Sequence, residues 1–215
     1  MTSAQPPTAT PLPAAPVVSK YSEARQRHAE YAFCANHLEK GSSLITVFTT
    51  MHPSKDPIKM LAQQNVLQAY ANLAPLVQGI VFTTSKHWIE HATKLGVKVI
   101  QNNALNPHGT PFLHDMYNKA FAATDSYFGM YANGDILFSE DFVTTMCSLK
   151  SAIDHGIIKE RVLLVGKRLN HDLKLTQLIT SNIQKHTQDI LDWAKTAVLF
   201  QNNAQDFFAV TRATW

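Results

Sequence analysis

One stretch decides the fold of this chain: Tyr127-Phe128-Gly129-Met130-Tyr131-Ala132-Asn133-Gly134-Asp135-Ile136-Leu137-Phe138. Its first half is aromatic and apolar, which predicts a buried strand that stops at Asn133. Asn-Gly is a strong turn signal, so the carboxylate of Asp135 is expected at the end of that strand. Open α/β sheets bind their ligands at this carboxyl edge. The alternative is an ordinary turn that links two hydrophobic segments.

Strands and helices alternate on the N-terminal side of this stretch. Short β-branched or apolar runs predict the strands, and segments with helical spacing of apolar residues predict the helices. We expect strands at 44–50, 77–82 and 97–100, and helices that begin at Pro57, Ser85 and Pro111. Gln63, on the first helix, is expected to face away from the sheet. This alternation predicts an α/β domain with a mostly parallel, Rossmann-like sheet that has helices on both faces.

The remaining segments extend the pattern towards both ends of the chain. After the central strand we expect a helix capped by Ser139, a strand at 162–166, a helix near 190–198 and a last strand at 207–210. The N-terminal residues are rich in proline, which predicts a disordered arm. The expected plan is an arm (1–20), an accessory helix (21–41) and one α/β domain (42–215).

Composition excludes several classes of function. The net charge is only +3 and no long run of Lys or Arg provides a surface for nucleic acid. Cys34 and Cys147 are too few for a disulfide framework or a zinc site, and Cys147 is expected to be a buried thiol. No apolar run approaches the roughly 20 residues of a membrane helix, and no signal-peptide core is visible. The default expectation is a cytoplasmic protein, or a secretory one if the natural N-terminus is longer.

The turn after the first strand lacks the glycines of a dinucleotide-binding site. It consists of Thr49-Thr50-Met51-His52-Pro53, and a phosphate-binding P-loop is absent from the sequence as well. Any bound phosphate therefore needs another source of positive charge. A divalent metal on a strand-end carboxylate is one such source, since Mg²⁺ typically uses one or two carboxylates together with phosphate oxygens.

Several segments together resemble nucleotide-diphospho-sugar glycosyltransferases of the GT-A fold. The resemblance is carried by Ile45–Thr50, Gln78–Thr83, Gly109–Pro111, Tyr131–Phe138, Val165–Arg168 and Asp206–Phe208. It runs from about Leu44 to Arg212. In such enzymes an Asp-X-Asp motif after a central strand binds Mn²⁺ or Mg²⁺ and the diphosphate of the donor. Here Asn133-Gly134-Asp135 occupies that place, so the resemblance implies a metal and nucleotide role for Asp135 and a weaker nucleotide role for Asn133.

The resemblance also implies roles for residues at other strand ends. Thr49 and Thr50 would contact the nucleotide; the alternative is that both satisfy backbone groups at a strand end. Lys167 and Arg168 would meet phosphate or acceptor, unless they are simply a solvated basic pair. Asp206 would be the catalytic base that deprotonates the acceptor hydroxyl, although an Asp that caps a turn is common.

A second motif suggests a different chemistry. His87-Trp88-Ile89-Glu90-His91 matches the H-x-x-E-H pattern of inverted zinc proteases. The two histidines are four residues apart on an expected helix, so both could bind one metal. Trp88 and Ile89, however, belong to the buried side of that helix, which places the histidines towards solvent. We therefore interpret them as exposed helix residues.

Two classes of function stay open at this point. One is an enzyme that transfers a sugar from a nucleotide-diphosphate donor to a hydroxyl acceptor with divalent metal assistance. The other is a non-catalytic α/β binding or interaction module that keeps the fold. The missing first Asp favours the second. The chain is also expected to be an incomplete catalytic domain, because the strand at 207–210 would be a bare edge followed only by residues up to Trp215.

Overall fold

The structure is a computed structural model that describes Cys34, residues 42–201 and residues 205–215. The Pro-rich arm expected over 1–20 lies outside the described residues. The accessory helix expected over 21–41 lies outside them too, apart from Cys34. What the structure does describe is the α/β domain expected over 42–215.

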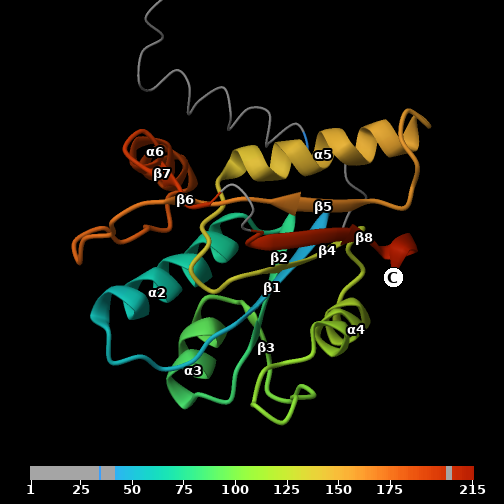
Figure 1. The fold of residues 1–215 in the computed structure, drawn as a ribbon. Helices are drawn as coiled ribbons and strands as arrows, with labels where there is room; N and C mark the ends of the chain where they lie inside the picture. Colours follow the sequence, from blue (N-terminus) through green and yellow to red (C-terminus); the bar gives the residue numbers. More distant parts are fainter. Residues whose placement is uncertain (1–33, 35–41, 202–204) are drawn as a thin grey trace, which may run out of the picture.

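A six-stranded sheet forms the centre of this domain (Figure 1). Its strands are β1 (Ile45–Thr50), β2 (Val77–Phe82), β3 (Lys98–Ile100), β4 (Phe128–Ala132), β5 (Leu163–Gly166) and β8 (Phe207–Thr211). The spatial order is β3-β2-β1-β4-β8-β5. The first four strands in this order are parallel to one another, whereas β8 is antiparallel to both β4 and β5. The expected mostly parallel α/β class is therefore confirmed.

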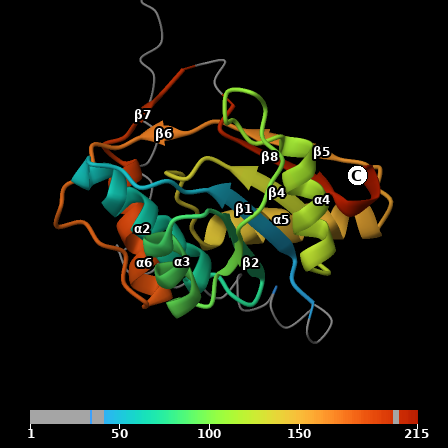
Figure 2. The same cartoon turned by 90° about the horizontal axis from the view of Figure 1, so that it is seen from below.

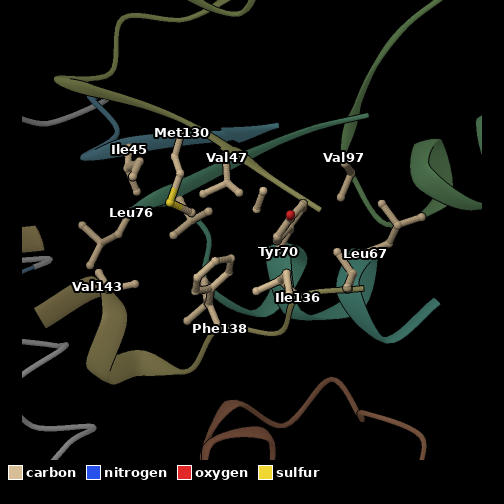
Figure 3. Close-up of a cluster of buried hydrophobic side chains, with 14 of the residues drawn as sticks. Ile45, Val47, Leu67, Tyr70, Leu76, Val97, Met130, Ile136, Phe138 and Val143 are labelled. Atoms are coloured by element: carbon tan, nitrogen blue, oxygen red, sulfur yellow. The ribbon is translucent and has the colours of Figure 1, made fainter. Parts of the chain in front are cut away.

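Helices cover both faces of the sheet. One apolar cluster joins the sheet to α2 (Pro57–Asn72), α3 (Lys86–Lys94) and α5 (Glu140–Asp154). A second cluster on the other face joins it to α4 (Leu113–Ala123). Figure 1 shows α5 above the sheet and α4 below it. Figure 3 shows the first cluster, in which Leu67 and Tyr70 of α2 lie beneath Val47 and Met130 of the sheet.

The ends of the early helices follow from local sequence. Asp56 caps α2, because its Oδ1 accepts a hydrogen bond of 2.9 Å from the backbone N–H of Ile58, and Pro57 occupies the first turn. α3 ends before Gly96, which has φ of 74° and so adopts the left-handed conformation that closes many helices. Both boundaries agree with the sequence-based expectation.

Two helices begin elsewhere than expected. α4 starts at Leu113 rather than at Pro111, because Pro111 pairs with Leu105 in an isolated antiparallel bridge. The helix expected near 190–198 is α6 (Ile183–Ala194), whose cap Asn182 accepts from the backbone N–H of Lys185 at 2.8 Å. In the sequence, α6 lies between two short strands, β6 (Leu169–Asn170) and β7 (Val198–Leu199), which pair with each other.

The segment before α6 is docked onto α2 by two asparagines. Asn65 is fully buried; its Nδ2 donates to the carbonyl of Gln177 and its Oδ1 accepts from the N–H of Ile179, both at 2.8 Å. Asn72 donates to the carbonyl of Thr180 at 2.7 Å. These bonds place α6 beside α2, as Figure 2 shows.

The last strand is not the bare edge that was expected. β8 lies between β4 and β5, so both of its edges are paired. The ring of Phe207 packs against those of Phe138 and Phe142, with centroids 5.4 and 6.1 Å apart. The outer strand on this side is β5, whose Leu163 is 62% exposed. The reason is long-range pairing: the chain returns from β7 into the gap beside β4. The 3-10 turn Arg212–Thr214 follows.

The two cysteines also differ from expectation. Cys147 is not a free thiol, because it forms a disulfide with Cys34 across 113 residues of sequence, with the two Cα atoms 6.2 Å apart. The bridge ties residue 34 to α5. Sequence alone could not pair them, because their proximity depends on where α5 packs.

Candidate functional site

The candidate site lies at the carboxyl ends of β1 and β4, the two strands at the centre of the sheet. From β1 the chain continues into α2 on one face, whereas it enters β4 from α4 on the other face. The strand order reverses at this point, and open α/β sheets bind ligands where it does so. Thr50 ends β1, and Asn133-Gly134-Asp135 follows β4.

Three strand ends are tied together next to this point. The backbone N–H of Asn133 donates to the carbonyl of Asp206 at 3.2 Å, and the N–H of Asp206 donates to the carbonyl of Gly166 at 3.0 Å. Side chains add to these backbone hydrogen bonds: Arg168 Nη1 and Asn133 Nδ2 both donate to Asp206 Oδ1, at 2.9 and 3.4 Å. The structure thus brings Asn133, Arg168 and Asp206 together.

Tyr131 extends this network of hydrogen bonds towards β1. Its hydroxyl donates to Asn133 Oδ1 at 3.2 Å. Burial raises the pKa of Tyr131 above its usual value, and the negative charge of Asp135 raises it further, while the hydroxyl of Thr50 acts in the opposite sense. The phenol therefore remains a hydrogen-bond donor at neutral pH, and it fixes the side-chain oxygen of Asn133.

Three buried polar atoms at these strand ends have no hydrogen-bond partner among the described residues: Thr49 Oγ1, Gln63 Oε1 and Asp206 Oδ2. Their residues are 0%, 5% and 4% exposed. Buried polar groups are nearly always hydrogen-bonded, so atoms of this kind indicate a ligand or ordered water. A site with several unpaired acceptors favours a ligand that carries hydroxyl or N–H donors.

Gln63 is the residue that the sequence-based interpretation placed wrongly. It was expected to face away from the sheet, yet it is buried, and its Nε2 lies 3.8 Å from the position that a Cβ atom on Gly134 would take. A signal was present: Gln63 shares the three-, four- and seven-residue spacing with Val66, Leu67 and Tyr70, which form the buried face of α2. A polar residue on an apolar helical face points to a site.

Gly134 allows the ends of β1 and β4 to approach closely. A Cβ atom at this position would lie 2.7 Å from the carbonyl oxygen of Thr50 and 3.4 Å from Thr49 Oγ1. The first contact is with backbone, which cannot rotate away, so a side chain here requires the two strand ends to separate.

Gly134→Ala is therefore expected to lower the free energy of unfolding by about 1–3 kcal/mol, the usual range for an overpacked position. Urea unfolding followed by tryptophan fluorescence measures this change. The matched control is Asp135→Ala, because the neighbouring Asp135 is exposed and its truncation should remove no packing contacts. Equal midpoints for the two variants would contradict the close approach at Gly134.

The other residues expected at the site lie at its rim. Asp135 and Lys167 are exposed, and Thr50 is half-buried. Within residues 42–201 and 205–215 and at Cys34, no three His, Cys, Asp or Glu side chains form a group that could hold a metal ion. Asp135 fits a divalent metal only as a single carboxylate ligand, with phosphate oxygens of a bound nucleotide completing the coordination shell.

The H-x-x-E-H motif lies on α3, the helix that follows β2. Trp88 is fully buried, as expected, and the rings of His87 and His91 are stacked in parallel with centroids 6.3 Å apart. Glu90 forms an exposed pair with Lys86. Partial burial lowers the pKa of His91, and the neighbouring His87 and Lys94 add to this effect. Within the motif, His87 and Glu90 are exposed and His91 is half-buried.

No protein-family model matches the sequence, and no curated protein matches it significantly. No helix of the described residues is long and apolar enough to cross a membrane.

Proposed function

We propose that this protein binds a nucleotide-diphosphate sugar at the carboxyl ends of β1 and β4 and transfers the sugar to a hydroxyl acceptor. The observation that carries the proposal is a set of three buried acceptors without a hydrogen-bond partner among the described residues, Thr49 Oγ1, Gln63 Oε1 and Asp206 Oδ2, near the reversal of strand order. A nucleotide sugar is rich in the hydroxyl donors that such atoms need. The GT-A resemblance of the same segments supports this choice of ligand.

The nucleotide would lie against β1, where Thr49 and Thr50 contact its base or ribose. Asn133 and Asp135 would face the diphosphate across the turn, and Lys167 and Arg168 would supply positive charge. Asp135 would hold Mn²⁺ or Mg²⁺ jointly with the phosphate oxygens. A metal bound there offsets the charge that develops on the leaving diphosphate.

Asp206 would act as the base towards the acceptor. Its Oδ1 accepts from Arg168 and Asn133, so Oδ2 is the oxygen left for an acceptor hydroxyl. The hydroxyl proton would pass to Oδ2 as the acceptor oxygen bonds to the anomeric carbon. The bond from that carbon to the diphosphate breaks, and its electron pair leaves with the diphosphate.

Asp135→Asn is expected to abolish the metal-dependent part of nucleotide binding and to leave the melting temperature unchanged, because the side chain is exposed at a strand end. Calorimetry with a panel of nucleotide sugars, with and without Mn²⁺, measures this. If Mn²⁺ tightens binding equally in both proteins, the metal lies elsewhere. If no nucleotide or nucleotide sugar binds the wild-type protein, the proposed function is wrong.

A second candidate is a module that binds the donor without transferring the sugar. It is favoured by the ion pair between Arg168 and Asp206, which occupies the carboxylate that a base would use. Donor hydrolysis and transfer assays separate the two candidates. Tight donor binding with no turnover over a broad acceptor panel would favour the module.

A further inference from the structure

Arg168 is held in place on three sides. Its Nη1 donates to Asp206 Oδ1 at 2.9 Å, and its Nε donates to Asn170 Oδ1 at 2.9 Å. The guanidinium carbon lies 4.0 Å from the centre of the Phe200 ring. Asp206 directly precedes β8, Asn170 belongs to β6, and Phe200 directly follows β7. A long and flexible side chain is thereby fixed in one orientation before any ligand arrives.

The guanidinium still has donors to offer. Arg carries five N–H donors in a planar fork, and two of them are used by Asp206 and Asn170. The side chain of Arg168 is 24% exposed, whereas that of Asp206 is 6% exposed. The ion pair therefore has its carboxylate inside and part of its cation towards solvent. A planar fork with free N–H groups suits the oxygens of a phosphate.

Charge also distinguishes this pair from a purely structural one. A buried ion pair contributes little net stability, because desolvation offsets most of the attraction. Asp206 moreover keeps one oxygen that has no hydrogen-bond partner in the described part of the chain, which a carboxylate placed only for stability would not do. Both observations favour a functional reason for burying this carboxylate at the strand ends.

We propose that Arg168 is a preorganised anion-binding residue of this site, and that Asp206 is the positioning residue that aims its guanidinium at the diphosphate. This inference rests on the proposed function for the identity of the anion. It adds a source of affinity for the diphosphate that does not depend on a metal. It also gives Asp206 a role through Oδ1 that is separate from the role of Oδ2 towards an acceptor.

The two possible effects of Asp206 on an anion have opposite signs. If Asp206 were only a nearby negative charge, Asp206→Asn would remove repulsion and tighten anion binding. If Asp206 positions Arg168, the same change loosens the guanidinium and weakens binding, even though the site becomes more positive. The sign of the change in affinity therefore identifies the role.

The experiment measures binding of inorganic pyrophosphate to the full chain by calorimetry in EDTA, so that protein cations alone are tested. We expect Arg168→Gln to weaken binding at least tenfold, Arg168→Lys to weaken it by less, and Asp206→Asn to weaken it about fivefold or more. Asp206→Glu should recover part of the loss. The matched control is Arg161→Gln, an exposed arginine before the other end of β5.

Melting curves ensure that each variant is folded at the temperature of the titration, and Asp206→Glu covers the case in which Asp206→Asn does not fold. Unchanged or tighter binding in Asp206→Asn, no loss in Arg168→Gln, or no pyrophosphate binding to the wild type would each overturn the inference. The proposed function is tested separately with nucleotide sugars. Arg168-dependent pyrophosphate binding without any nucleotide binding would leave the anion site standing and remove the donor assignment.

Discussion

Acidification from pH 7 to pH 4 is expected to cost the protein about 3 kcal/mol of folding free energy through His186 alone. His186 of α6 is fully buried. Burial lowers its pKa from 6.5 to about 4, against smaller opposing effects of the Phe138 backbone and of the Asp189 charge. The folded protein therefore favours the neutral form of the His186 imidazole.

The direction of the effect follows from proton binding. The unfolded chain takes up a proton at His186 near pH 6.5, whereas the folded protein takes it up only near pH 4. Stability from this residue is fully present above pH 6.5 and is lost progressively as the pH falls to 4. Protonation would place a charge next to Thr187, whose hydroxyl donates to the buried Glu140 at the start of α5 at 2.7 Å.

His186→Gln isolates this contribution, because glutamine does not titrate. Urea unfolding of both proteins from pH 7.5 to pH 4 gives the difference in free energy of unfolding at each pH. The advantage of the wild type should shrink by about 3 kcal/mol over this range. Parallel curves for the two proteins would show that His186 is not held neutral by the fold.

Loss of the disulfide is the second change with a large expected effect. Cys147→Ser should lower the free energy of unfolding by about 2–5 kcal/mol, because the bridge to Cys34 closes a long loop in the unfolded chain. The measurement is the urea midpoint of the wild type with and without reductant. Reductant should shift the wild type towards the variant and leave the variant itself unchanged.

A thiol titration under denaturing conditions provides the control, since an intact bridge leaves no reactive thiol in the wild type. Two free thiols in the unreduced protein, or a midpoint that reductant does not change, would contradict the pairing of Cys34 with Cys147.

The sequence by itself determined the local elements and the class of fold. Spacing of apolar residues identified α2 and α3, and the β-branched and apolar runs identified β1, β2 and β4. Caps such as Asp56 and Gly96 act within a few residues of the ends that they fix, so they can be recognised without tertiary structure. The turn at Asn133-Gly134 marked the carboxyl edge in the same way, because a turn signal is also local.

Only the tertiary structure decided which strand ends and side chains meet. β8 was expected to be a bare edge, yet it lies between β4 and β5 because pairing across long sequence separations fills that gap. Arg168 meets Asp206 over 38 residues and Cys34 meets Cys147 over 113, and no local pattern encodes either contact. Gln63 is buried because α2 packs with that side against the strand ends. Periodicity fixes which residues share a helical face, whereas packing against the sheet fixes what that face meets.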